Sequence, residues 1–400
     1  ATPGMENRKG VILQAHMDMV PQKNNDKDFD FTKEPISAYI DGEWVTADGT
    51  TLGADNGMGV AAILAVMGAK NLQHGPLEAL ITASEETGMY GAFGLKPGIL
   101  QGDILLNLDS ETEGELYVGC AGGLDLNVTL KYKEENVPAG YVAKKIDVKG
   151  LLGGHSGIEI ILERGNANKI MARLLLKTQK EVGLRLAAID GGGLRNAIPR
   201  EAIATVMVPE AQVESLNELV KTIAETVSEE LKGVDDNVTI LLSDTATPAS
   251  VMDLDSQNRL LNAIQGCPNG IFRMSPSIKG LVQTSTNLAR VVSENGTVRM
   301  QALLRSSVDS EKEYLAETMS SVFTLAGAEV TPSGGYSGWN PDMSSPILKT
   351  MTESYEALYG QEPAVMAIHA GLECGLLGGK YPGLDMISFG PTICYPHSPD

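Results

Sequence analysis

Short apolar runs that alternate with helix signals constrain the fold of this chain more than any other feature. The runs lie at residues 11–13, 77–83, 104–108 and 386–389. Residues 59–67 indicate a helix, because Asp55 and Asn56 just before them are favourable N-cap residues. Buried strands that alternate with helices are typical of a parallel sheet. The predicted fold class is therefore α/β, with a mixed, mostly parallel sheet flanked by helices.

The middle of the chain has a different pattern, which predicts a second domain. Residues 143–148 and 203–208 alternate like half-buried strands, and 168–182 and 213–231 carry apolar side chains at helical spacing. We expect an inserted α+β domain at 121–335, between a first part of the other domain at 1–120 and a second part at 336–400. Glycine-rich turns at 121–123 and 333–335 are the expected hinges.

The charge of the chain limits its partners. Its 51 acidic and 31 basic residues give a net charge of −20, which argues against nucleic acid and anionic membranes. The four cysteines form no CxxC pair and fit a reducing cytosol, so we expect a cytoplasmic protein. Both ends of the sequence look cut, because it opens almost directly into a strand and stops just after His397. A targeting segment outside it stays an open alternative.

A histidine or an acid follows each of the predicted strands. These residues, with one acid before the helix at 59–67, are His16, Asp18, Asp55, Glu85, Glu86, Asp109 and His397. Sites in open α/β sheets form beyond the carboxyl ends of the strands, so we expect these side chains to meet there. Two imidazoles together with several carboxylates are the ligand inventory of a two-zinc hydrolase.

Each of these residues also has an ordinary structural interpretation. Asp55 suits a plain N-cap, and His16 with Asp18 suits a capped strand end. The functional interpretation has a physical reason in each case. His16 and Asp18 are two apart on an extended segment and face the same side, so Asp18 can accept the second ring N–H of His16. Asp55, between two glycines, would have to bridge two cations with its two oxygens.

The remaining acids lie at the ends of apolar strands, where a charged carboxylate without a partner costs free energy. Glu85 and Glu86 are adjacent at the end of an apolar strand, and like charges there need a cation to offset them. One of them could bind metal while the other holds a water as general base. Asp109 ends a buried strand and needs a partner. The alternatives are that Glu85 and Glu86 are ordinary solvated loop acids and that His397 is a loop histidine without a function.

Candidate substrate contacts lie elsewhere in the chain. His155, in a glycine-rich loop of the inserted domain, could reach the oxyanion of a tetrahedral intermediate. Arg305 ends a predicted strand and could clamp a carboxylate, together with Asn196. Glu373 could hold a free amine. A purely structural role is at least an equal alternative for each of them.

Eight segments in a fixed order resemble the zinc aminoacylase/carboxypeptidase/dipeptidase family of metallopeptidases. The segments are HMDM, GADNG, EE followed by TG, LDSE, GGHSG, RNAIPRE, HAGLECG and PHSPD, and they span nearly the whole chain. The resemblance implies a zinc-peptidase catalytic domain with an inserted lid domain. It also implies two zinc ions per chain, for which cobalt or manganese can substitute.

The resemblance also assigns roles to residues. It implies that one metal is held by His16, Asp55 and Asp109, and the other by Asp55, Glu86 and His397. Three ligand carboxylates and a bridging hydroxide then balance the four positive charges of two zinc ions. Asp18 is implied to orient His16, Glu85 to be the general base, and His155 to stabilise the transition state. Asn196 and Arg305 are implied contacts of the substrate carboxylate, and the Asp55–Asn56 peptide bond is implied to be cis.

The implied activity is hydrolysis of dipeptides, including Xaa-His, by a metal-bridging water. A homodimer through the lid domain is implied as well, and whether His155 acts in its own chain or in a partner stays open. Two alternatives remain. An amidohydrolase acting on N-acyl amino acids would use the same chemistry, and Glu373 argues against it if it binds a free amine. A zinc-binding scaffold without activity would have no use for Glu85.

Overall fold

The structure is a computed structural model that describes residues 1–24 and 26–399. The chain divides into two compact units. The first unit comprises Ala1–Cys120 and Ser337–Asp400, and the inserted unit comprises Ala121–Tyr336. Each unit has its own sheet and its own core.

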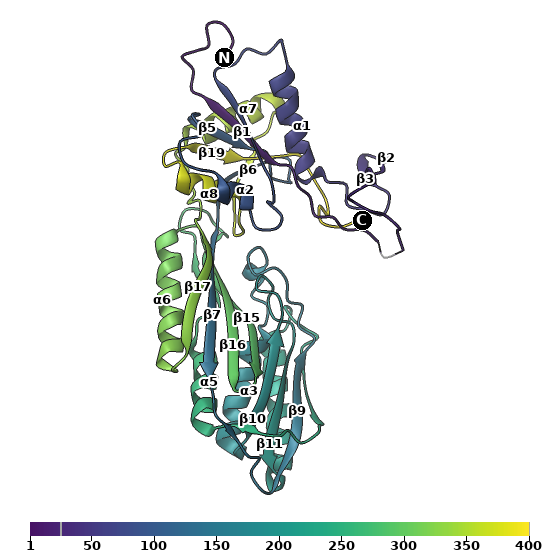
Figure 1. The fold of residues 1–400 in the computed structure, drawn as a ribbon, viewed down its shortest axis with the longest axis vertical. Helices are drawn as coiled ribbons and strands as arrows, with labels where there is room; N and C mark the ends of the chain where they lie inside the picture. The colour runs from purple at the N-terminus through teal and green to yellow at the C-terminus, as the bar shows by residue number, and fades with distance from the viewer. Residues whose placement is uncertain (25, 400) are drawn as a thin grey trace. The chain divides into compact units, whose positions relative to one another are not determined.

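The first unit is built on a sheet with the strand order β18-β6-β19-β5-β1-β4. Figure 1 labels β1, β5, β6 and β19 of this sheet. Its strands are β1 (Val11–His16), β4 (Leu77–Thr82), β5 (Ile104–Asn107), β6 (Glu115–Cys120), β18 (Ala364–Ile368) and β19 (Asp385–Ser388). Neighbouring strands are parallel except β19 and β6, which pair antiparallel. The prediction of a mixed, mostly parallel sheet is confirmed.

Helices cover both faces of this sheet. They are α1 (Ala54–Gly68), α2 (Tyr90–Gly94), α7 (Pro346–Tyr359) and α8 (Glu373–Lys380). Leu13 of β1 packs with Ile63 of α1, whereas its neighbour Ile12 packs with Leu377 of α8. Because successive side chains of a strand point to opposite faces, α1 and α8 lie on opposite sides of the sheet. A hairpin of β2 (Ala38–Asp41) and β3 (Trp44–Ala47) completes the described elements of this unit.

The inserted unit is an α+β structure with an antiparallel sheet. The strand order is β12-β9-β11-β10-β15-β16-β7-β17, and β14 pairs with β15. These strands are β7 (Gly122–Lys131), β9 (Tyr141–Lys149), β10 (Arg185–Gly192), β11 (Ala202–Pro209), β12 (Thr239–Asp244), β14 (Gly270–Met274), β15 (Val282–Glu294), β16 (Thr297–Ser306) and β17 (Glu329–Tyr336). A small ladder pairs β8 (Glu134–Glu135) with β13 (Val251–Met252).

Four helices of this unit supply its core. They are α3 (Ala167–Val182), α4 (Val213–Glu230), α5 (Leu254–Gly266) and α6 (Asp309–Leu325). Helix α3 begins where the Asn166 side chain accepts the N–H groups of Asn168 and Lys169, and it ends at Gly183, whose φ is 71°. Its buried Leu174 and Leu175 pack in one cluster with residues of the sheet. One continuous core therefore joins helices and sheet.

The two glycine-rich segments expected as hinge turns are paired strands instead. Gly122 and Gly123 begin β7, and residues 333–335 lie in β17, which pairs with β7. A Cβ atom at Gly123 would come within 2.5 Å of the Tyr336 ring. Gly123 thus allows an aromatic ring to pack closely against the strand. This close packing, rather than a turn, explains the glycine at this position.

Within residues 1–24 and 26–399, none of the helices combines the length and the apolar character that crossing a membrane would take.

Candidate metal centre

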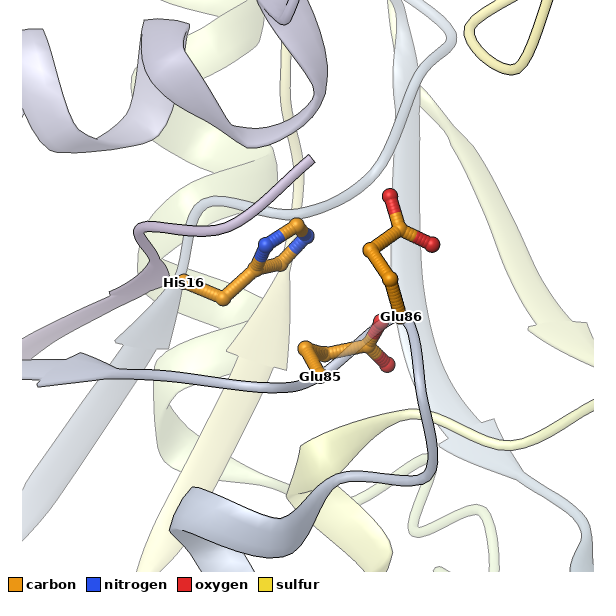
Figure 2. Close-up of side chains that lie close together, drawn as sticks. All are labelled: His16, Glu85 and Glu86. Carbon is orange, nitrogen blue, oxygen red and sulfur yellow. The ribbon is translucent and has the colours of Figure 1, made fainter. Parts of the chain in front are cut away.

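The predicted ligands come from the carboxyl ends of adjacent strands. His16 is the last residue of β1, Glu85 and Glu86 follow β4, and Asp109 follows β5. These strands are neighbours and run parallel, so their ends open at the same edge of the sheet. Figure 2 shows the His16 ring and the two glutamate carboxylates around a common space.

Asp55 joins the two histidines of the centre. Its Oδ1 lies 3.0 Å from Nε2 of His16, and its Oδ2 lies 3.3 Å from Nε2 of His397. His16 Nε2 is also 3.2 Å from Asp109 Oδ1, and His397 Nε2 is 3.2 Å from Glu86 Oε2. Each carboxylate oxygen of Asp55 therefore faces one histidine, and each histidine faces a second carboxylate. The Asp55–Asn56 peptide bond is cis, as expected.

The possible ligand atoms form three overlapping groups. In each group they lie within 4.8 Å of one another, and the groups are His16–Asp55–Asp109, Asp55–Glu86–His397 and His16–Glu85–Glu86. The first two are the ligand sets expected from the sequence. Imidazole and carboxylate together suit zinc and other divalent metals.

The hydrogen bonds of His16 indicate a cation site. Its Nδ1 lies 2.9 Å from the backbone carbonyl oxygen of Asp18, which can only accept, so Nδ1 carries the hydrogen. A neutral ring therefore directs the lone pair of Nε2 at the carboxylates of Asp55 and Asp109. That arrangement is repulsive unless a proton or a metal ion lies between these atoms.

Two buried oxygens support a metal rather than a proton alone. Oε1 of Glu86 is buried and accepts no hydrogen bond from any described residue, and Oδ1 of Asp109 is buried with Nε2 of His16 beside it, at 3.2 Å. A buried carboxylate oxygen without a partner is costly, and a bound cation would satisfy both oxygens. The residues present therefore fit a dinuclear metal centre.

The pKa values of the centre show how tightly protons are held without metal. Burial lowers the pKa of His16, but the adjacent carboxylates of Asp109 and Asp55 outweigh it and raise the pKa to about 11. Hydrogen bonds to Asp55 and Glu86 raise the pKa of His397 to about 10. Burial raises the pKa of Asp109. Metal binding must therefore displace protons from this cluster.

Asp18 lies beside His16 but bonds mainly to other groups. Its carboxylate accepts the backbone N–H of Glu85 at 3.1 Å and that of Glu86 at 3.2 Å. The distance from its Oδ1 to Nδ1 of His16 is 3.6 Å, so the ring bonds to the carbonyl group of Asp18 rather than to its carboxylate. The Asp18 carboxylate therefore orients the Glu85–Glu86 segment.

Three comparisons connect this geometry with known proteins. Residues 12–400 match the sequence profile of peptidase family M20/M25/M40. The chain belongs to this family. The metallopeptidase resemblance found in the sequence is thereby confirmed, and a metal cofactor follows from membership.

Two family members are similar over the full length of the chain. The cytosol non-specific dipeptidase of Escherichia coli K12 is 50% identical over 400 residues, which are 100% of this chain and 82% of that relative. The crystal structure of an aminoacylhistidine dipeptidase from Vibrio alginolyticus superposes with a TM-score of 0.93 at 51% identity, again over 100% of this chain and 82% of the other. This peptidase therefore shares both sequence and fold with dipeptidases.

The inserted unit of this M20-family peptidase holds His155 in one tautomer. The backbone N–H groups of Gly157 and Ile158 point at its Nδ1, at 3.3 and 3.1 Å. Nδ1 therefore accepts, and the neutral ring carries its hydrogen on Nε2. Burial, with the charge of Arg305, lowers the pKa of His155 to about 4. With this tautomer Nε2 is the donor of the ring, and it faces Nη2 of Arg305 at 3.4 Å without accepting from it.

Arg305 lies next to His155, with Nη2 at 3.4 Å from Nε2 of the ring. It is 5% exposed, and its Nε is buried without a hydrogen bond to the described chain. Among the described residues no carboxylate forms an ion pair with Arg305, so this buried cation is suited to an anionic group from outside. Asn196 is exposed, and its backbone carbonyl accepts the N–H of Ser156 in the His155 loop.

Glu373 does not lie where a substrate amine could reach it. The first residue of α8, it is 0% exposed, and its Oε2 accepts hydrogen bonds from Gln14 and Thr82, each at 2.6 Å. Burial raises the pKa of Glu373 to about 7. The expectation that it holds a free amine is corrected, because the side chain points into the core of the first unit.

Glu111 is a carboxylate near the centre for which the sequence predicts no role of its own. Burial, and then the charge of Asp55, raises the pKa of Glu111 to about 7, so it lies within electrostatic reach of the ligands. Its position two residues after Asp109 was the only signal available. A loop acid at this spacing is common, and the signal was too weak to use.

Proposed function

We propose that this chain is a dinuclear zinc dipeptidase. The arrangement of Asp55, with one oxygen facing each histidine at 3.0 and 3.3 Å, carries the proposal. One zinc would be held by His16, Asp55 and Asp109, and the other by Asp55, Glu86 and His397. Both similar relatives are named as dipeptidases, one of them for aminoacylhistidine substrates. Unblocked dipeptides, including Xaa-His, are therefore the proposed substrates.

The metal ions and the residues around the centre have different roles in the proposed hydrolysis. When bound, two zinc ions supply Lewis-acid polarisation of the scissile carbonyl and lower the pKa of water. The Glu85 carboxylate takes a proton from the attacking water and delivers it to the nitrogen of the leaving amine. Asp18 fixes the backbone of Glu85 by accepting its N–H. This bond holds the base in place while it exchanges its proton.

The proposed contacts of the substrate lie in the inserted unit. His155 donates its Nε2–H to the oxyanion that forms at the scissile carbonyl, either in its own chain or in a partner. Arg305 and Asn196 bind the substrate carboxylate, because a buried guanidinium without a carboxylate partner is a ready site for it. A homodimer through the inserted unit would allow the partner arrangement.

The proposal also covers the cellular compartment of the protein and the partners that it does not bind. One similar relative is named as a cytosolic protein, and we place this chain in the cytoplasm. The net charge of −20 supports a function without nucleic acid or anionic membranes.

A substrate panel tests the proposal. The zinc-loaded protein is assayed on dipeptides including Xaa-His, on N-acyl amino acids and on tripeptides, with the metal content measured by elemental analysis. Dipeptides should be cleaved with the highest kcat/KM, and two zinc ions should be bound per chain. Preference for N-acyl amino acids would identify an amidohydrolase instead. Two bound zinc ions without any turnover would identify a scaffold.

A further inference from the structure

A row of buried polar side chains crosses the core of the first unit below the metal centre. Gln14 of β1, Asn107 of β5 and Ser388 of β19 lie opposite one another in the sheet, and each is 0% exposed. Strands buried on both faces are normally apolar almost throughout, so three polar residues side by side require an explanation.

The hydrogen bonds of this row all run in one direction. Ser388 Oγ donates to Asn107 Oδ1, and Asn107 Nδ2 donates to Gln14 Oε1. Gln14 Nε2 then donates to Glu373 Oε2. At the far end Ser110 Oγ lies 2.6 Å from Ser388 Oγ and must be the donor, because Ser388 uses its own hydrogen on Asn107.

The row ends on one carboxylate. Thr82 of β4 donates to the same oxygen of Glu373 from the other side, at 2.6 Å. The donors from β1 and β4 therefore converge on Glu373, and those from β5 and β19 reach it through Gln14. We call the set Ser110, Ser388, Asn107, Gln14, Glu373 and Thr82 the polar row.

The polar row separates the metal centre from the apolar core. Gln14 lies two residues before His16 and Asn107 two residues before Asp109, while Thr82 lies three residues before Glu85. One step further from the centre, Ile12 and Leu105 pack with Cys374 and Leu377 of α8. The polar row is thus the layer directly beneath the strand ends that carry the ligands and the base.

Stability alone does not account for this layer. Buried polar groups are costly unless every bond is made, and well-packed apolar side chains are often as stable. The bonds of the row leave Oε1 of Glu373 without a partner among the described residues, but they hold neighbouring strands in one arrangement. That property matters where three strand ends must keep ligand atoms within a few tenths of an ångström.

We propose that Glu373 is a positioning residue that anchors the polar row and so fixes the strand ends carrying His16, Asp109 and the Glu85–Glu86 segment. It touches neither substrate nor metal. Its carboxylate is the common acceptor of Gln14 and Thr82, and without it Thr82 keeps only the longer contact of 3.3 Å to the carbonyl oxygen of Ala15. This inference deepens the proposed function and rests on it.

The test uses Glu373→Leu, which keeps most of the volume of the side chain and removes the oxygen that accepts from Gln14 and Thr82. On a dipeptide that the parent cleaves, we expect kcat to fall at least tenfold while KM stays within twofold. The dissociation constant for zinc, measured by competition with a chelator, should rise about tenfold. Ser388→Ala removes only the distant end of the row and should give a smaller change, about threefold, in the same direction.

Asp385→Asn is the matched control. Asp385 begins β19, and its carboxylate likewise accepts two hydrogen bonds, from Ser345 Oγ and the N–H of Ile347, but at the opposite end of the strand. It should leave kcat and zinc affinity unchanged, and circular dichroism should show that all three variants are folded.

Two results would overturn the inference. A rise in KM for dipeptides with unchanged kcat and unchanged zinc affinity would make Glu373 a substrate contact. Variants of Glu373 and Ser388 that match the Asp385 control would remove any role for the polar row. If the parent cleaves no dipeptide, the proposed function fails, and the zinc measurements still decide the role of Glu373.

Discussion

Replacing Asp18 with asparagine separates two roles for one side chain. The sequence predicts that the carboxylate orients His16, whereas in the structure it accepts the N–H groups of Glu85 and Glu86. His16 bonds to the backbone carbonyl of residue 18, which the substitution keeps. The variant should therefore disturb the base and its neighbour while leaving His16 in place.

The size of the effect follows from the bonds lost. Asparagine keeps one acceptor oxygen and turns an NH₂ group toward the other N–H. A hydrogen bond to a charged group contributes about 1.5–3 kcal/mol and a neutral one about 1 kcal/mol, so replacing two of the first kind with one of the second loses about 2–5 kcal/mol. If the loss is felt in the transition state, kcat falls about 30- to 5000-fold.

Steady-state kinetics on a cleaved dipeptide, with metal content per chain, measure this effect. The variant should bind as much zinc as the parent and turn over more slowly. Asp41→Asn, at an exposed carboxylate on β2, is the control and should match the parent. A variant that binds less zinc but keeps its kcat per bound metal would refute the reasoning, because Asp18 would then act on His16.

Three further outcomes are expected. Glu85→Gln should keep two metal ions per chain and lose about 10²- to 10⁴-fold in kcat, measured with elemental analysis; an unchanged rate would exclude Glu85 as the base. His155→Ala should lose about 10²- to 10³-fold in kcat. Because its pKa is lowered to about 4, His155 stays neutral above that pH, so kcat of the parent should show no limb from it between about pH 5 and 9. A limb that vanishes in the variant would contradict this. Removing metal with a chelator should lower the Tm by about 10 °C if free zinc was about 1,000 times its Kd, and added zinc should restore it in calorimetry; an unchanged Tm would mean that the metal does not stabilise the fold.

Four strands of the first sheet, β1, β4, β5 and β19, could be predicted because a strand buried on both faces is apolar almost throughout, whereas β6 and β18 were not predicted. The segment VILQAH of β1 is an example, with five of its six residues buried. Its neighbours were not predictable. Which strands lie side by side depends on contacts between segments hundreds of residues apart, and no local pattern encodes them. The glycines of β7 show the same limit, because their partner Tyr336 comes more than 200 residues later.

Most of the candidate ligands could be named from the sequence because His16, Glu86 and Asp109 follow strand ends, whereas Asp55 lies in the first turn of α1. The direction of individual bonds could not be predicted. The spacing of His16 and Asp18 indicates that both side chains face one side, but not that the N–H groups of Glu85 and Glu86 reach the carboxylate first. Glu373 shows the same difficulty, since Gln14 and Thr82 are separated from it by 359 and 291 positions.

The place of β19 in the first sheet has a consequence for synthesis of the protein. It lies between β5 and β6, although more than 250 residues, including the whole inserted unit, separate it from both. At about 5–20 residues per second, a ribosome needs tens of seconds to deliver it after β5. During that time β5 and β6 have bare edges that invite pairing with other chains. The inserted unit, whose strands are contiguous, can complete itself meanwhile. Chaperone demand during translation should therefore fall on the first 120 residues.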